Sequence, residues 1–288
     1  MNDVPVIFLE GVVSQFFRKK VLLDGSNLSG PPGLVASEAY ARRCRHCLRL
    51  TNGRLEGESY LNCEDQRVDI ETLGRKHLQY IAIGIHADEE EYSTDPEAKE
   101  RVLSATKGQH VLLGLRTPNI SEEIAKCVES IRFVFELHVY TKITSDVLKM
   151  MRLLVEKNTL NTMDFANDVE IDDETAQLLV DLLKQSQFYE MFLYGKCSAV
   201  LKEIIASWKE NSEEMVGKMV YCEEEFFEIQ LSSTEFPFEK CTEEEERDAK
   251  PLILLQAVGH TSPEIGAEKS GWKPGLLSFT SLFWIQNQ

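Results

Sequence analysis

The chain has 288 residues, with 48 acidic and 31 basic side chains and a formal net charge of −17. That length fits one large domain or two small ones, and a hydrophobic content of 43% is enough for a substantial core, which argues against wholesale disorder. A negative field of this size repels phosphate backbones and anionic lipids, so we expect neither a nucleic-acid nor a membrane partner.

The start of the chain shows no export signal. Residues 1–10 have no cationic stretch followed by a long apolar core, and no run in the chain approaches the ~18 apolar residues of a membrane-spanning helix. Seven cysteines spread through so long a chain are typical of reduced thiols rather than of a disulfide scaffold. We therefore expect an intracellular protein, in the cytoplasm or the nucleus.

Residues 4–17 have the spacing of one amphipathic helix. It follows an extended Val4-Pro5 pair, and its apolar positions are Phe8, Leu9, Val12, Val13 and Phe16. A second apolar segment contains Leu22, Leu23 and Leu28. Pro31-Pro32-Gly33 then interrupts the place where a third helix would develop. We interpret residues 1–55 as a small N-terminal helical segment. In the alternative interpretation, the first helix only packs on the end of the domain that follows.

The motif Cys44-Arg45-His46-Cys47 is a candidate metal or redox site. Two thiolates at this spacing can share a zinc ion, with Cys63 as a third ligand, but no second pair supplies the fourth. Incidental cysteines are the preferred interpretation, so we expect no metal and no cofactor. The nearby basic side chains could contact phosphate, but a solvated helix face is the simpler interpretation; they are Arg42, Arg43, Arg45, Arg49 and Arg54.

Strand and helix patterns alternate from about residue 75. The segment 78–83 alternates as a strand does, and a helix is predicted to follow the capping box Thr94-x-x-Glu97. Residues 111–115 read as the next strand, and Ser121 precedes the next helix. Further on, Ser145 and Asp172 occupy positions typical of helix starts.

The strongest pattern is a repeat of 28 residues. Apolar residues recur at offsets 0, 3 and 5 in three segments that begin at Leu160, Phe188 and Val216. Helical patterns lie between these segments, so each unit is a short strand and a helix. Such units bury their apolar faces only by stacking on their neighbours. We therefore predict a β/α repeat domain over residues 75–235, although an ordinary α/β layer stays open as an alternative. Residues 236–288 are assigned to an acidic linker and a C-terminal tail.

The L-x-x-L-x-L skeleton of these segments resembles leucine-rich repeats, although the ninth position departs from that family. The resemblance implies an α/β fold, an irregular leucine-rich-repeat-like β/α solenoid with a small N-terminal helical segment. In such a solenoid, residues between the core positions of the strands face a protein partner. The candidates for partner binding are Glu136, Asp164, Phe192 and Val220.

The N-terminal segment resembles an F-box, with Val4-Pro5 in place of its Leu-Pro start. Together with the repeats, it is similar to F-box proteins of the nematode type. That resemblance implies a non-catalytic substrate receptor of a cullin–RING ubiquitin ligase, whose box docks on a Skp-type adaptor. The residues that would bind the adaptor are Val4, Pro5, Phe8, Leu9, Val12 and Phe16.

An enzyme remains the alternative, although the sequence contains no G-x-x-x-x-G-K-[ST], G-x-G-x-x-G, G-x-S-x-G or H-E-x-x-H motif and we assign no catalytic residue. The site of such an α/β enzyme would lie at the carboxyl ends of the strands, near Asn167, Asp168 and Gly195.

Overall fold

The structure is a computed structural model that describes residues 5–14, 19–88, 93–166, 169–194, 197–223, 241–242 and 252–256. The chain divides into two compact units. One comprises Met1–Ser37 with His260–Gln288, and the other comprises Glu38–Gly259. They are described separately below.

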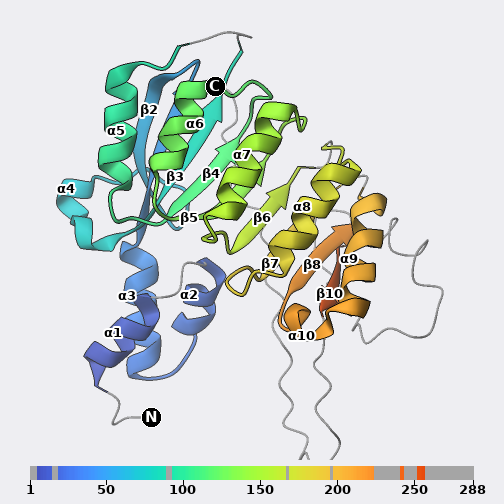
Figure 1. The fold of residues 1–288 in the computed structure, drawn as a ribbon. Coiled ribbons are helices and arrows are strands. Elements are labelled where there is room, and N and C mark those ends of the chain that lie inside the picture. The colour runs from blue at the N-terminus through green and yellow to red at the C-terminus, as the bar shows by residue number, and fades with distance from the viewer. Residues whose placement is uncertain are drawn as a thin grey trace, which may run out of the picture. The chain divides into compact units, whose positions relative to one another are not determined.

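Three short helices form the described part of the first unit: α1 (Val6–Ser14), α2 (Lys19–Ser26) and α3 (Pro31–Arg42), whose last turn enters the second unit (Figure 1). The prediction that Pro31-Pro32-Gly33 interrupts a third helix is wrong, because α3 begins at Pro31. Proline is tolerated in the first turn of a helix, where the backbone N–H that it lacks would have no partner within the helix.

The second unit opens with a hairpin that the sequence analysis missed. Strands β1 (Cys44–Thr51) and β2 (Arg54–Asn62) pair antiparallel through a two-residue turn. Asn52 and Gly53 have φ values of 49° and 73°, as the twisted hairpin turn requires, and Asn-Gly is the residue pair best suited to it. The arginines at positions 45, 49 and 54 therefore lie on strands, and the expectation of a basic helix face is wrong.

A single mixed sheet organises the rest of the unit. Its strand order is β2-β1-β3-β4-β5-β6-β7-β8-β10-β9, with β1 and β3 to β8 parallel and the other strands antiparallel to their neighbours. The strands after the hairpin are β3 (Leu78–His86), β4 (Val111–Leu115), β5 (Val134–Val139), β6 (Thr162–Phe165), β7 (Glu190–Leu193), β8 (Met219–Glu223), β9 (Cys241–Thr242) and β10 (Leu252–Gln256). The predicted α/β class is therefore confirmed.

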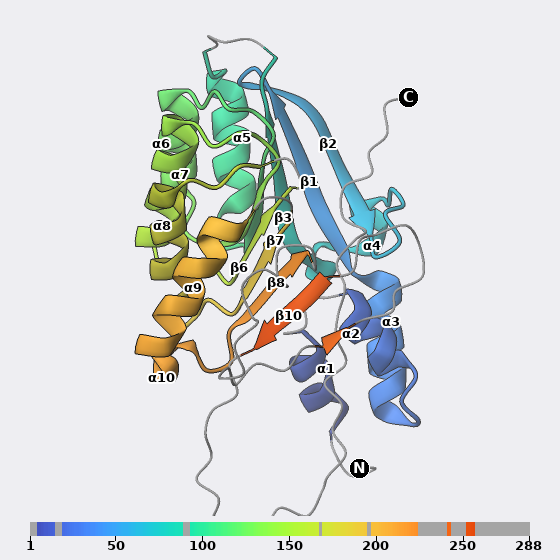
Figure 2. The same cartoon turned by 90° about the vertical axis from the view of Figure 1, so that its right-hand side faces the viewer.

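Helices α5 to α10 all lie on one face of this sheet, as Figure 2 shows. They are α5 (Pro96–Thr106), α6 (Glu122–Ser130), α7 (Ser145–Glu156), α8 (Asp173–Leu183), α9 (Ser198–Glu210) and α10 (Ser212–Met215). A short helix α4 (Ile70–Leu73) and a 3₁₀ turn (Arg75–His77) connect β2 to β3. From β3 to β8, sequential strands are neighbours, so each helix crosses over between adjacent parallel strands. We call the other side of the sheet, on which none of α5 to α10 lies, the helix-free face.

The core lies between the sheet and these helices. Residues that alternate along each strand, such as Ile81 and Ile83, Leu113 and Leu115, are fully buried there. The predicted apolar stripes of α7, α8 and α9 are buried against them, including Met151, which is 0% exposed. Burial of this apolar layer is the main term that holds the unit together.

Helix starts follow the predicted side-chain chemistry, with two shifts of one residue. Ser121 and Asp172 cap α6 and α8 as predicted, each accepting a hydrogen bond from a backbone N–H in the first turn. The cap of α5 is Asp95 rather than Thr94, and the cap of α7 is Thr144 rather than Ser145. Each such cap contributes about 1 kcal/mol.

Three long polar side chains, which follow α7, α8 and α10, donate hydrogen bonds to backbone carbonyl groups of the preceding strand–helix repeat. Lys157 Nζ donates to three carbonyl groups at the end of α6, those of Glu129, of Val128 at 3.1 Å and of Ile131 at 2.7 Å. Gln185 Nε2 donates to the carbonyl of Val155, at the end of α7, at 2.9 Å. Lys218 Nζ donates to the carbonyls of Gln185 and Phe188, both at 2.6 Å. These bonds connect consecutive strand–helix repeats to one another.

The third repeat is displaced by one residue from its predicted position. In the sheet, Met163 pairs with Met191, 28 residues later, but Met191 pairs with Val220, 29 residues later. Val220 is therefore 0% exposed in the core, and Val216, a predicted core position, is 50% exposed. The backbone turns through Gly217, whose φ is 79°, just before β8, and this turn carries the additional residue.

Candidate functional site

Large apolar side chains are exposed mainly in the N-terminal helices. Among the described residues, eight large hydrophobic side chains are exposed, and seven of them lie between Val6 and Leu34. Ile7, Phe8 and Leu34 are 79%, 60% and 72% exposed. Exposed apolar side chains concentrated in so short a segment make these helices a candidate interaction surface. We call these seven residues the apolar surface: Val6, Ile7, Phe8, Val12, Leu23, Leu28 and Leu34.

The predicted adaptor-binding residues divide into three groups. Pro5, Phe8 and Val12 are exposed, and the last two belong to the apolar surface. Leu9 is half-buried in α1. Val4 and Phe16 lie outside the described residues. The helix α1 thus presents part of the predicted set to solvent, which is the geometry that a docking helix needs.

The predicted partner-binding residues do not form one exposed row. Glu136 and Asp164 lie on the helix-free face, half-buried and in contact with the same histidine. Phe192 shares that face but is only 4% exposed, stacked on Tyr221 with ring centroids 4.5 Å apart. The prediction that Val220 faces solvent is wrong, because the one-residue displacement of β8 turns it into the core.

A buried histidine, His138, joins these two carboxylates. Its Nε2 lies 2.6 Å from Glu136 Oε1, and its Nδ1 lies 2.8 Å from the Tyr140 hydroxyl and 3.5 Å from Asp164 Oδ2. Burial opposes the charged imidazolium, but the attraction and hydrogen bond of Glu136, together with Asp164, outweigh it and raise the pKa of His138. When protonated on both nitrogens, His138 donates to Glu136 and Tyr140.

Burial and these contacts also shift the pKa values of Asp164 and Tyr140. Burial raises the pKa of Asp164 to about 6; Glu136 adds to this rise and His138 opposes it. Burial, and then the charge of Asp164, raise the pKa of Tyr140 as well. The cluster is thus able to hold or release a proton near neutral pH. The sequence analysis selected Glu136 and Asp164 but missed His138 and Tyr140, although residues 136, 138 and 140 share one face by simple alternation.

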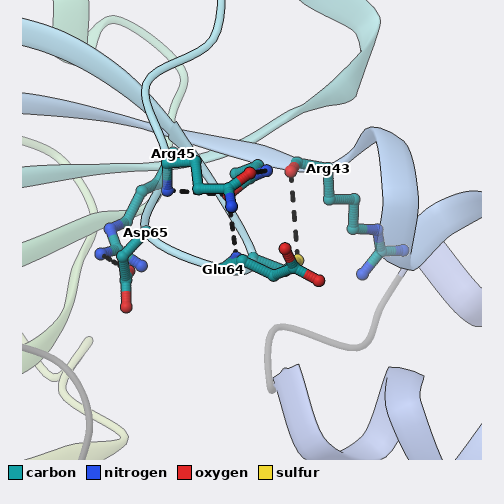
Figure 3. Close-up of polar contacts among 7 residues, drawn as sticks. Arg43, Arg45, Glu64 and Asp65 are labelled. Atoms are coloured by element: carbon teal, nitrogen blue, oxygen red, sulfur yellow. Dashed lines mark hydrogen bonds and ion pairs between the residues drawn. The ribbon is translucent and has the colours of Figure 1, made fainter.

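A second polar cluster lies at the end of the β1–β2 hairpin. Arg45, whose side chain is 11% exposed, forms an ion pair with Asp65 in the turn after β2 (Figure 3). Asp65 has a φ of 64°, and the turn is held by Asn62, whose side-chain oxygen accepts from the backbone N–H of Glu64 and of Gln66, both at 2.9 Å. The paired carboxylate compensates a largely buried guanidinium.

The cysteine motif does not gather ligands for a metal. Burial alternates along β1, so Cys44 and His46 lie on one side of the strand, and Arg45 and Cys47 on the other. Within the part of the chain that the structure describes, no group of three or more histidine, cysteine, aspartate or glutamate side chains is arranged to hold a metal ion. The carboxyl-end residues of the enzyme alternative, Asn167, Asp168 and Gly195, lie outside the described residues.

Comparison with known proteins adds no relative: no protein-family profile, no curated protein and no solved structure matches the chain. Among the described residues, no helix has both the length and the apolar character needed to cross a membrane.

Proposed function

We propose that the protein is a non-catalytic interaction protein whose N-terminal helices dock on a second protein through the apolar surface. The observation that carries the proposal is the location of that surface: of the eight large hydrophobic side chains exposed among the described residues, seven lie between Val6 and Leu34. Complete burial of each such side chain contributes about 1.5–3 kcal/mol. A few of them are therefore enough to drive association.

The proposed partner is the Skp-type adaptor of a cullin–RING ubiquitin ligase, which would make the β/α unit a substrate receptor. The order of three short helices with an apolar first helix, and the resemblance of residues 4–28 to an F-box, support this assignment. The sequential parallel strands with helices on one face support a leucine-rich-repeat-like solenoid as the receptor domain (Figure 2).

The test is a pull-down of the purified full-length chain with the purified Skp-type adaptor. An Ile7→Asp/Phe8→Asp double variant introduces two charges into the apolar surface at positions where the side chains are already exposed, so folding is retained. The matched control is Val216→Asp, which adds a charge at an exposed hydrophobic residue of the other unit. Circular dichroism verifies that all three proteins are folded.

We expect the wild type and Val216→Asp to bind the adaptor and the double variant to lose binding. Equal binding by all three proteins would show that the apolar surface is not the docking site. If the folded wild type does not bind, the ubiquitin-ligase assignment is wrong. Sedimentation of the wild type then shows whether the same surface instead joins two copies of this chain, which the double variant would separate.

A further inference from the structure

Two glycines leave a shallow floor on the helix-free face near the carboxyl ends of the parallel strands. Gly84 on β3 and Gly114 on β4 are paired in register, and both alternate with core residues, so they lie on the helix-free face. Arg49 on β1 is in register with Gly84, and His138 on β5 is in register with Gly114. Two adjacent strands thus have no side chain between Arg49 and His138.

Cationic side chains surround this floor. Arg49 is 51% exposed, and His86 follows Gly84 by two residues on the same face. Arg116 follows Gly114 by two residues, is exposed, and has its guanidinium over the Tyr140 ring at 4.5 Å. Three strands therefore bring two guanidinium groups and one imidazole to one place.

Charges of both signs meet at this place. Burial, followed by the charges of Arg49 and Arg116, lowers the pKa of His86, which shows that both arginines lie near the imidazole. Among the described residues, the acids nearby are Glu56, whose Oε2 is 4.0 Å from Arg49 Nε, and Asp88, which with Glu56 partly opposes the shift. In a chain of net charge −17, this place is close to charge balance, with two guanidinium groups against two carboxylates, so an anion meets less repulsion here than elsewhere on the chain.

A buried hydroxyl provides an independent sign of an absent partner. Thr51 pairs in register with His86, is 7% exposed, and alternates along β1 with the core residue Leu50. Its Oγ1 has no hydrogen-bond partner among the described residues. Buried hydroxyl groups normally have such a partner, so Thr51 places an unsatisfied hydroxyl group beside His86.

We propose that this glycine-floored site binds a phosphate monoester. Guanidinium groups from separate strands donate to a tetrahedral dianion from several directions, whereas a single bidentate arginine satisfies a carboxylate. The absence of a side chain at Gly114 allows the anion to approach β4, and at Gly84 it makes room for the His86 imidazole, whose Nε2 lies 3.2 Å from the place that a Cβ would occupy. The carboxyl ends of parallel strands are also where open α/β sheets bind their ligands. The phosphate can belong to a small metabolite or to a phosphorylated side chain.

Nuclear magnetic resonance of the histidine rings in the full chain tests the proposal directly. Inorganic phosphate is titrated at constant ionic strength, with acetate as the comparison anion, and the other histidines serve as internal references. We expect a saturating change at His86 and a rise of its pKa, because a bound anion favours the imidazolium and binding and protonation are linked. The signal is assigned by its loss in His86→Gln.

Three variants determine whether the change comes from this site. Arg49→Gln and Arg116→Gln should each weaken phosphate binding by about tenfold, since each removes a charge-assisted donor. Gly114→Ala should weaken it as well and still fold, because an added Cβ would meet only ordinary contacts, the nearest being the Ile83 carbonyl oxygen at 3.8 Å. The matched control is Arg152→Gln on α7, which pairs with Glu174 and should bind phosphate as the wild type does.

Equal affinities in the wild type and in all three site variants would overturn the proposal, as would a change at His86 that does not saturate or that acetate reproduces. If the site is confirmed, a phosphoserine peptide and glycerol phosphate are compared. Tighter binding of the peptide assigns the phosphate to a modified protein, and tighter binding of glycerol phosphate assigns it to a metabolite. The outcome does not depend on the adaptor experiment, because the two tests use different residues and ligands.

Discussion

Alanine substitutions at Val216 and Val220 test the displaced third repeat. Val220 is 0% exposed in the core and Val216 is 50% exposed, so the same substitution should have very different costs. Removing two carbons from Val220 loses about 1.6 kcal/mol of transfer free energy, and the cavity that remains brings the cost to about 2–3 kcal/mol. For Val216, half of the transfer term applies and no cavity forms, so the cost should stay below about 0.8 kcal/mol.

Urea unfolding of the two variants and the wild type measures these differences. The slope of the free energy against urea should be the same for all three proteins, because neither substitution changes the surface exposed on unfolding appreciably. The strict 28-residue repeat predicts the opposite order, with Val216 in the core and Val220 facing outward. A larger cost at Val216 would therefore refute the register of β8 and the inward orientation of Val220.

Three further substitutions test other contacts by urea unfolding. Lys218→Met should cost about 3 kcal/mol, because two carbonyls in the loop between α8 and β7 lose their charged donor; a cost below about 1 kcal/mol would contradict those contacts. Asp65→Asn should cost about 1 kcal/mol, since it retains a side chain that tolerates positive φ but leaves Arg45 without its carboxylate; an unchanged midpoint would show that the pair contributes nothing. Burial raises the pKa of Asp164 to about 6, so its protonated form contributes stability below pH 4 that is lost as the pH rises through 6. The stability of the wild type relative to Asp164→Asn should therefore fall by up to about 3 kcal/mol between pH 4 and pH 7, and a difference independent of pH would refute the shift.

The sequence predicted best what depends on local chemistry and on repetition. Residues 111–115 form the predicted strand, and Ser121 and Asp172 cap the predicted helices, because each signal is contained within a few neighbouring residues. The hairpin of β1 and β2 has a signal of the same kind, the Asn52-Gly53 turn between two alternating segments. The basic side chains around it were interpreted as a helix face instead.

Long-range features were harder to predict. Nothing in the local pattern shows that His138 would contact both Glu136 and Asp164, because the contact with Asp164 depends on the register between β5 and β6. The same is true of the floor at Gly84 and Gly114, which exists only because β3 and β4 are paired in that register. Spacings between equivalent strand positions vary along the chain, so no fixed period gives these registers.

The sequence therefore predicts that a strand belongs to the core more reliably than it predicts which of its residues face outward. A shift of one residue exchanges the faces of a strand completely, because successive side chains point to opposite sides. The prediction that β8 is a core strand does not depend on its register, because Met219, Val220, Tyr221 and Cys222 are all largely apolar. The prediction of which residues face a partner does depend on the register, because a shift of one residue replaces every residue assigned to that surface. Site residues on repeat strands should thus be assigned from pairing register, which here places Tyr221 rather than Val220 beside Phe192.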